Sequence, residues 1–174
     1  LPIVQTGMGW VSGARLTAAT SEAGGLGLLA SATMTLPELS AAITKVAART
    51  TNPFGVNLLP NAPDVDARID LLIESGVKVA SFVGAPKAKQ VERLSAEGIV
   101  TMPTIGKQRH AEKMADLGVG AVIAQGNEGG GHTGPIATTL LLPQVIEAVG
   151  DRIPVLAAGG FHSGAGLVAA MAYG

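Results

Sequence analysis

Cysteine is absent from the 174 residues, which excludes disulfides, thiolate metal sites and a cysteine nucleophile. Long hydrophobic runs are also missing: no stretch of about 18 apolar residues occurs. The first residues lack the basic-then-apolar pattern of a signal peptide, so we expect a cytoplasmic protein that does not enter a membrane. Charge of one sign does not dominate either. A net charge of −1 gives no electrostatic reason to expect nucleic acid as a partner.

Aromatic residues make up only 3% of the chain and charged residues 14%, whereas apolar residues reach 47% and glycine 24 positions. The core must therefore be built from Ala, Val, Leu, Ile and Gly. A small charged surface and a large apolar fraction are typical of a parallel α/β protein, because its strands are buried on both faces. The length suits one domain.

Short apolar runs alternate with segments of helical period along the whole chain. We expect strands at residues Ile3–Gln5, Leu26–Ala30, Phe54–Leu58, Val77–Val83, Ile99–Met102, Ala121–Gln125 and Ile153–Ala157. Between them, apolar residues recur at helical spacing, as in Leu36, Leu39, Ile43 and Val46. Thr35-Leu-Pro-Glu38 has the pattern of a capping box and marks the start of that helix.

Each expected helix ends in a glycine shortly before the next strand. We expect the left-handed conformation that glycine tolerates after a helix at Gly24, Gly76, Gly98, Gly118 and Gly150. Seven alternating strand–helix units imply parallel strands with right-handed crossovers. We interpret residues 1–174 as a single (β/α)₈ TIM-barrel domain with about seven of its eight units, C-terminally incomplete because strand eight is missing. An open doubly wound sheet is the alternative.

The final helix should run from about Gly164 to Tyr173. If the barrel interpretation holds, Val168, Ala169 and Ala172 on this helix should pack against a strand supplied by residues beyond 174. A barrel wall left open at this point would expose unpaired strand edges.

Active sites of such barrels lie at the carboxyl ends of the strands. After the first strand, Gly7 lets a ligand approach the backbone, and Met8 and Trp10 can pack against a flat ring; a tight turn with an apolar plug is the alternative. After the third strand, the amide of Asn57 can donate and accept hydrogen bonds with a heterocycle, or can form an Asx turn into Pro60.

The sixth strand leads into the densest loop, Gln125-Gly-Asn-Glu-Gly-Gly-Gly-His-Thr-Gly-Pro135. Its three consecutive glycines can present several backbone N–H groups to a polar ligand, and His132 can exchange protons near neutral pH. A glycine-rich surface loop with an incidental histidine is the alternative. After the seventh strand, Gly159 and Gly160 precede a helix start, an arrangement that suits a phosphate group.

The other histidines have simpler interpretations. His110 lies on a helix and faces packing or solvent, and His162 begins a helix, which it caps if it has no other role. Neither the histidine spacing nor any carboxylate cluster predicts a metal site. Motifs of serine hydrolases, P-loop proteins and Rossmann folds are absent. Glu128 is the one strand-end carboxylate that could serve as base in a non-redox phosphate-binding barrel, such as a sugar-phosphate isomerase.

Five segments together resemble the nitronate monooxygenase (2-nitropropane dioxygenase) family, which includes flavin-type enoyl-acyl-carrier-protein reductases and related acyl-CoA flavoproteins. They are Pro2-Ile-Val-Gln-Thr-Gly-Met-Gly-Trp10, Ala23-Gly-Gly-Leu-Gly27, Pro53-Phe-Gly-Val-Asn57, Glu128-Gly-Gly-Gly-His-Thr-Gly134 and Ala157-Ala-Gly-Gly-Phe161. The resemblance runs in order from the first residue to the last. It implies an FMN-binding barrel.

The resemblance also implies roles for individual residues. Gly7 and Met8 would lie along the isoalloxazine ring, Asn57 would contact its pyrimidine side, and the ring and ribityl chain would lie near Gln125 and Gly131. The phosphate would lie at Gly159 and Gly160, and His132 falls on the catalytic histidine of the family. This chain lacks the second phosphate loop, which follows strand eight in the family. It also has Thr104 where some nitronate oxidisers have a lysine.

The resulting hypothesis is an FMN-dependent oxidoreductase that oxidises alkyl nitronates with O₂. The alternative within the family is an FMN-dependent reductase or dehydrogenase of enoyl-acyl-carrier-protein or acyl-CoA substrates. NAD(P)H is a candidate reductant for either. The expected partner is a small molecule, a nitronate or an acyl thioester, and a homodimer is compatible with the sequence. A non-redox phosphate-binding barrel is the third alternative.

Overall fold

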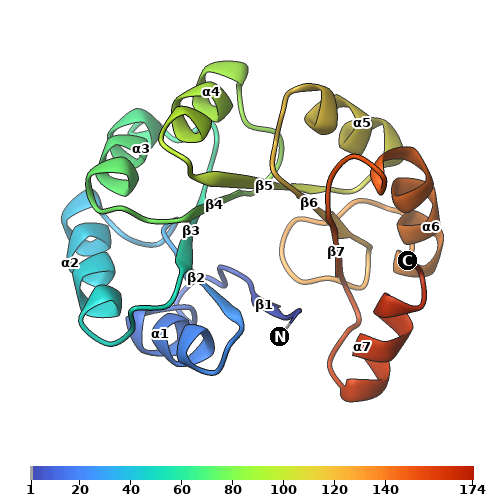
Figure 1. The fold of residues 1–174 in the computed structure, drawn as a ribbon, viewed down its shortest axis with the longest axis horizontal. Helices are drawn as coiled ribbons and strands as arrows, with labels where there is room; N and C mark the ends of the chain where they lie inside the picture. Colours follow the sequence, from blue (N-terminus) through green and yellow to red (C-terminus); the bar gives the residue numbers. More distant parts are fainter. Residues whose placement is uncertain (1) are drawn as a thin grey trace. The chain divides into compact units, whose positions relative to one another are not determined.

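The computed structural model describes residues 2–174, which form alternating strands and helices (Figure 1). The chain separates into two compact units, of which the first ends at Thr101 and the second runs from Met102 to Gly174. Seven parallel strands are each followed by a helix, so the predicted α/β class with seven strand–helix units is confirmed. No helix within residues 2–174 has the length and apolar character needed to cross a membrane.

The first unit contains four strands that pair side by side in chain order, all parallel. These strands are β1 (Val4–Gln5), β2 (Leu26–Ala30), β3 (Phe54–Leu58) and β4 (Val79–Phe82). The helices that follow them are α1 (Ala14–Glu22), α2 (Leu36–Ala47), α3 (Val65–Glu74) and α4 (Ala88–Ala96). The register places Asn57 of β3 beside Ala30 of β2 and Ser81 of β4.

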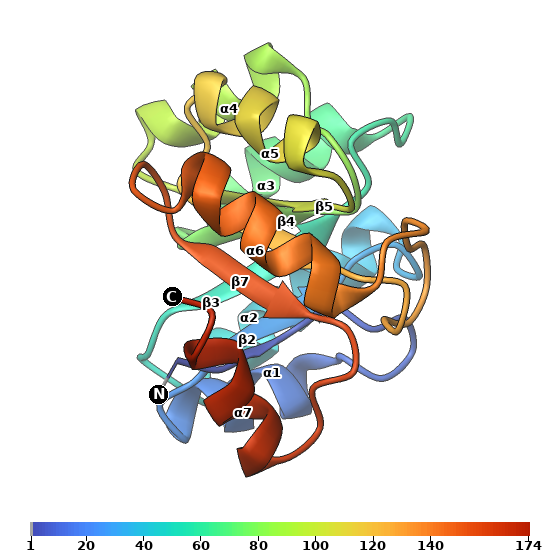
Figure 2. The ribbon, with the colours of Figure 1, turned by 90° about the vertical axis from the view of Figure 1, so that its right-hand side faces the viewer.

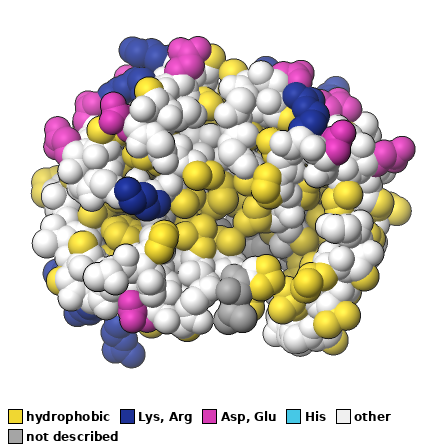
Figure 3. All heavy atoms as spheres, in the orientation of Figure 1, with side chains coloured by type: hydrophobic (Ala, Val, Ile, Leu, Met, Phe, Trp, Pro, Cys, Tyr) yellow, Lys and Arg dark blue, Asp and Glu magenta, His cyan; other side chains and the backbone are white. Residues whose placement is uncertain are grey.

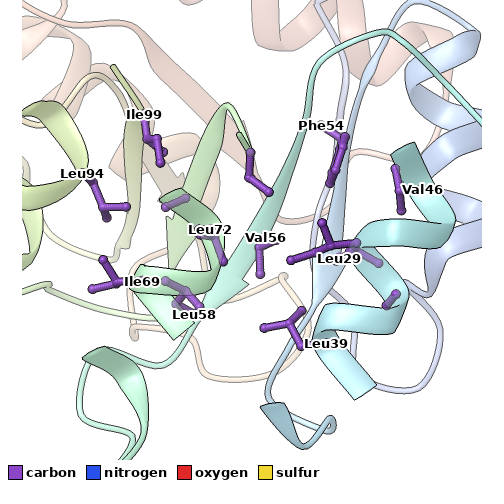
Figure 4. Close-up of a cluster of buried hydrophobic side chains, with 14 of the residues drawn as sticks. Leu29, Leu39, Val46, Phe54, Val56, Leu58, Ile69, Leu72, Leu94 and Ile99 are labelled. Atoms are coloured by element: carbon purple, nitrogen blue, oxygen red, sulfur yellow. The ribbon is translucent and has the colours of Figure 1, made fainter. Parts of the chain in front are cut away.

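The core of the first unit lies between its strands and helices, as Figure 4 shows. Val56 and Leu58 of β3 are buried among side chains from α2 and α3, including Leu39 and Ile69. Apolar side chains occupy both faces of these strands, as expected for a parallel sheet covered by helices. The capping box predicted at Thr35 and Glu38 is confirmed: the threonine hydroxyl accepts from the Glu38 N–H, and the Glu38 carboxylate accepts from the Thr35 N–H.

The second unit contains the strands β5 (Val100–Ile105, which begins in the first unit), β6 (Val122–Gln125) and β7 (Val155–Ala158). They pair in parallel, β5 with β6 and β6 with β7. The helices are α5 (Gln108–Asp116), α6 (Thr138–Val149) and α7 (Gly164–Met171). Figure 2 shows α6 lying across β7, which it contacts, as it does β6.

Four of the five predicted helix-end glycines are confirmed. Positive φ angles of 67° to 85° occur at Gly24, Gly76, Gly98 and Gly118. The prediction for Gly150 is wrong, because its φ is −65° and the chain continues in a right-handed turn there. A Cβ on Gly150 would lie 2.6 Å from the carbonyl oxygen of Ile146. Glycine at this position permits a close backbone approach rather than a left-handed turn.

The fifth strand is longer than its apolar run predicted. Pro103, Thr104 and Ile105, which follow the predicted strand Ile99–Met102, belong to β5, and Thr104 pairs with Ile123 of β6. Pro103 misled the prediction because proline cannot donate a hydrogen bond to a sheet. The chain between β5 and α5 therefore consists only of Gly106 and Lys107.

Helix α7 presents apolar side chains to its surroundings, and Figure 3 shows hydrophobic atoms gathered over it. Its described residues include none that is buried; Val168 is 68% exposed and Met171 63% exposed. Ala169 and Ala172 are exposed as well. The packing of Val168, Ala169 and Ala172 against a further strand stays a prediction.

Candidate functional site

In the first unit, the carboxyl ends of β1 and β3 meet through Gly7 and Asn57. A Cβ on Gly7 would lie 2.4 Å from the Cβ of Asn57, so only glycine lets the two backbones approach this closely. The Asn57 Nδ2 donates to the Gly7 carbonyl oxygen at 3.4 Å, and the Ser81 Oγ donates to the Asn57 Oδ1 at 3.0 Å. Asn57 thus lies within β3, and the alternative of an Asx turn into Pro60 is wrong.

The turn that follows Gly7 holds two apolar side chains outward. The Met8 N–H donates to the Ser12 Oγ at 2.8 Å, and this hydroxyl donates to the Thr6 carbonyl oxygen at 2.8 Å. Met8 is 40% exposed and Trp10 is 92% exposed. Trp10 has a φ of 60°, the one positive value at a non-glycine position in the described part of the chain. The turn therefore exposes two apolar side chains at this strand end.

Arg68 of α3 is a buried charged residue that sequence reasoning missed. Its guanidinium donates to the carbonyl oxygens of Ser31 and Met34 at 2.8 Å each, and it pairs with Asp64 at 2.8 Å. These bonds fix the loop that follows β2. A Cβ on Gly9 would lie 3.2 Å from the Thr33 methyl group, so a side chain at position 9 would crowd this loop.

In the second unit, the glycine-rich loop after β6 is folded back on its own strand. The Gln125 Nε2 donates to the Gly130 carbonyl oxygen at 2.8 Å, and the Gly129 N–H donates to the Gly126 carbonyl oxygen at 3.1 Å. Of the three consecutive glycines, Gly129 thus uses its N–H in a hydrogen bond inside the loop. The N–H groups of Gly130 and Gly131 donate no hydrogen bond within residues 2–174 and remain available to a ligand.

Glu128 connects this loop to two other elements through Thr138. Its carboxylate accepts from the Thr138 N–H at 2.9 Å and from the Thr138 Oγ at 2.7 Å, and the same hydroxyl lies 3.1 Å from the Gly159 carbonyl oxygen. Glu128 therefore caps the start of α6, which has no cap from its own preceding residue. The hydrogen bonds from the Thr138 side chain, then its backbone, hold the pKa of Glu128 below its ordinary value.

The lowered pKa of Glu128 predicts a pH-dependent loop. A carboxyl whose pKa is lower in the folded state stabilises that state above its ordinary pKa, near 4.3, and loses this contribution as the pH falls through the folded value. The hydrogen-exchange protection factors of residues 126–138, which are corrected for the intrinsic pH dependence of exchange, should therefore fall between about pH 5 and pH 3. In Glu128→Gln this fall in protection should disappear. Equal pH dependence in both proteins would contradict the capping role.

The proposed proton donor, His132, lies in this loop with its side chain exposed and bonded to no other residue among those described. After β7, Gly159 and Gly160 adopt φ angles of 104° and 80°, and α7 follows. Ser163, not His162, caps α7: its Oγ accepts from the Gly166 N–H at 3.2 Å. The His162 Nδ1 lies 3.3 Å from the Gly160 carbonyl oxygen.

His110 lies on α5 with an exposed side chain, consistent with the simpler interpretation given above. No group of three histidine, cysteine or acidic residues that could hold a metal ion occurs within residues 2–174.

The structure thus gathers the predicted residues into two groups, one in each unit. Gly7, Met8 and Asn57 belong to the first unit. In the second, Gln125 and His132 share one loop with Gly131, and Thr138 joins that loop to Gly159 and Gly160. The contacts of Ser12, Ser81 and Thr138 were not predicted. Ser12 alone had a local signal, since it follows the Gly7–Trp10 segment closely.

The family model for nitronate monooxygenase matches residues 1–69 and 61–174, which together span the chain. A curated relative from Mycobacterium tuberculosis is 62% identical over 174 residues, covering 99% of this chain and 49% of its own length. It is described as (3aS,4S,5R,7aS)-5-hydroxy-7a-methyl-1-oxo-octahydro-1H-indene-4-carboxyl-CoA dehydrogenase. The chain thus spans about half the length of this relative.

Two solved structures are similar over the whole chain. FabK from Thermotoga maritima has a TM-score of 0.95 and 38% identity, covering 99% of this chain and 55% of its own. A nitroalkane oxidase from Streptomyces ansochromogenes has a TM-score of 0.94 and 34% identity, covering all of this chain and 63% of its own. These similarities confirm the predicted barrel fold class. With the motif segments, the matched family model and the shared fold in agreement, this chain belongs to the nitronate monooxygenase family.

Proposed function

We propose that this chain supplies the FMN-binding and proton-handling residues of an oxidoreductase that acts on a coenzyme A thioester. The observation that carries the proposal is the 62% identity to a carboxyl-CoA dehydrogenase, against 34% to a nitroalkane oxidase. This favours the acyl-CoA alternative over the nitronate hypothesis with which the sequence was first interpreted. A bicyclic hydroxy acid linked to coenzyme A is the substrate class that the relative suggests.

The residues of the second unit fit the phosphate end of FMN. A Cβ on Gly160 would meet nothing nearer than the Glu128 Cβ at 3.6 Å, so the space beside this glycine is open. Backbone N–H groups and the start of α7 lie at the same strand end, where they would hold a phosphate. The unpaired N–H groups of Gly130 and Gly131 would hold polar atoms of the ring or the ribityl chain.

The residues of the first unit, taken by themselves, fit a flat ring system such as that of FMN. Asn57 donates only one hydrogen bond from its amide nitrogen within residues 2–174, so its other N–H can donate to a heterocycle. Gly7 and the exposed Met8 offer close backbone and apolar contact to a ring. These assignments and those of Gln125 and Gly131 stay proposals.

FMN supplies the two-electron redox chemistry when it is bound. The protein contributes orientation and proton transfer, and His132 is the residue we assign to the proton. Its exposed imidazole can accept a proton from the carbon beside the thioester carbonyl, or return one to it. The loop before this histidine is tied to β6 by the hydrogen bond from Gln125 to the Gly130 carbonyl oxygen, and the ring itself makes no hydrogen bond to the described residues.

The non-redox alternative required Glu128 as a base. In the structure, this carboxylate accepts two hydrogen bonds from Thr138, and its pKa is lowered rather than raised. A base that works near neutral pH needs a raised carboxyl pKa. The geometry therefore favours a capping role for Glu128 and weakens the isomerase interpretation.

The test uses the full-length protein and follows the flavin absorbance without oxygen. We expect the protein to purify yellow, and a matching hydroxyacyl-CoA to bleach the flavin within seconds. The free acid and a nitronate should bleach it slowly or not at all. A parallel run with NAD(P)H asks whether a pyridine nucleotide exchanges electrons with the same flavin. Rapid turnover of nitronate with oxygen, and no reaction with any thioester, would contradict the proposal.

A further inference from the structure

A shallow surface depression of about 490 Å³, called the cavity below, lies in the second unit beside the first turn of α5. It opens to solvent and is lined by Lys107, Gln108, Arg109, Glu112, Ile136 and Gln144. These residues come from α5, from the end of the glycine-rich loop and from α6, and the two helices pack against each other. None of the residues assigned above to FMN or to proton transfer lines this cavity.

Positive charges lie close together in the sequence here. Lys107 and Arg109 line the cavity and Lys113 follows on α5; like most lysines and arginines within residues 2–174, they take part in no ion pair, since the ion pairs there involve Arg68, Arg93 and Arg152. Glu112 is the one acidic residue in the lining, and it accepts from the Gln108 Nε2 at 3.0 Å. The cluster is therefore cationic, although the whole chain carries a net charge of −1.

The positive charges of these side chains affect the pKa of His110, which lies on α5. Partial burial is the main cause that lowers the pKa of His110, and Arg109, Lys107 and Lys113 lower it further. Three cations therefore act on the first part of α5, which carries Glu112 and, at its end, Asp116, whose carboxylate pairs with Arg152. Such a cluster costs free energy by mutual repulsion unless an anion occupies it.

The cavity lies at the same strand end as the glycine-rich loop. Gly106 ends β5 and precedes Lys107, and a Cβ on Gly106 would lie 3.2 Å from the Cα of Gly134. Gly134 follows His132 by two residues in the glycine-rich loop. A ligand seated in the cavity could thus reach toward His132 along one side of the second unit.

We infer that this cavity binds the phosphorylated adenosine diphosphate group of a nucleotide-bearing ligand, either the coenzyme A thioester or NADPH. Lysine and arginine are the side chains that hold phosphates, arginine through paired N–H donors. Gln108 and Gln144 add donors and acceptors for a base or ribose, and the half-buried Ile136 offers an apolar wall. The choice of coenzyme A as the ligand rests on the proposed function, whereas the proposal that the cavity binds phosphate rests on the cavity and its cations.

The experiment measures dissociation constants on the full-length holoenzyme by calorimetry. The ligands form two pairs, coenzyme A with dephospho-coenzyme A and NADP⁺ with NAD⁺. The first member of each pair carries one ribose phosphate that the second lacks. The variant is Lys107→Gln with Arg109→Gln. The matched control is Lys45→Gln with Arg49→Gln, which removes the same charge from exposed positions on and after α2. Flavin absorbance and thermal melting verify that both variants are folded.

We expect the cavity variant to weaken binding of the phosphorylated ligand about 100-fold, roughly tenfold for each lost cation, and the control to change it less than about twofold. Added salt should weaken the wild type more than the cavity variant. Loss confined to coenzyme A identifies the substrate as the source, and loss confined to NADP⁺ identifies the reductant. Unchanged affinity for all four ligands in the cavity variant would overturn the site.

The outcomes for the site and for the proposed function are separable. If no thioester bleaches the flavin but NADP⁺ binding depends on Lys107 and Arg109, the proposed function fails and the phosphate site stands. If a thioester bleaches the flavin while the cavity variant binds coenzyme A normally, the function stands and this site is wrong.

Discussion

The variant His132→Ala is expected to turn over substrate about 10²–10⁴-fold more slowly than the wild type while keeping its FMN. A positioned acid or base contributes about that factor to the rate of a proton-transfer step. The ring of His132 makes no hydrogen bond to the residues the structure describes, so its removal should leave the loop folded. The backbone groups proposed to hold the cofactor are unchanged by the substitution. Steady-state turnover and flavin content, measured on the same preparation, test both parts.

His110→Ala is the matched control for this variant. His110 is an exposed histidine on α5 of the same unit, and it lies outside the strand-end loops. Its substitution should change turnover by less than about twofold, well below the contribution of a proton-transfer group. Full activity in His132→Ala, or loss of flavin without any effect of added FMN, would reduce His132 to a structural part of its loop.

Gly160→Val should yield a protein without FMN. The substitution adds a branched side chain to the open space beside Gly160, which is where we propose that the phosphate lies. It also forces a β-branched residue into a φ of 80°, a conformation such residues avoid. Flavin absorbance per protein, compared with that of the wild type, gives the result directly.

The strain at Gly160 must be separated from the filling of the site, and Gly118→Val does this. Gly118 has a φ of 83° and open space around its missing Cβ, but it precedes β6 rather than following a strand. Its variant should lose about 1–2 kcal/mol of stability and keep its flavin. Normal flavin content in Gly160→Val, or equal flavin loss in both variants, would remove the phosphate assignment.

The parts of the fold that depend on local sequence were predictable. Apolar period and glycine position predicted all seven strands and most helix ends, because a buried strand and a left-handed turn each restrict the residues that form them. The predicted left-handed conformation of Gly150 and the predicted end of the fifth strand at Met102 were wrong. The carbonyl of Ile146 that requires glycine at position 150 is not visible in the glycine itself. The strand at Thr104 continues past a proline that normally ends one.

The sequence predicted the glycines and the histidine of the candidate site, but it did not predict the long-range contacts that hold these residues in position. The contact between Arg68 and the Ser31 carbonyl joins residues 37 positions apart, and the contact between Asn57 and Gly7 joins residues 50 apart. Nothing in the spacing of one sequence fixes such pairs, since they depend on the register between strands. Glu128 is an example: from the sequence alone it was a candidate base, and only the structure shows that its carboxylate is hydrogen-bonded to Thr138.

The hydroxyl of Thr138 touches both the loop after β6, through Glu128, and the loop after β7, through Gly159. A ligand that orders either loop therefore also favours the ordered form of the other. By thermodynamic reciprocity, FMN at Gly159–Gly160 would raise the affinity for a substrate beside His132 by the same factor as that substrate raises the affinity for FMN. Through this one threonine, bound substrate would slow the loss of FMN from the protein.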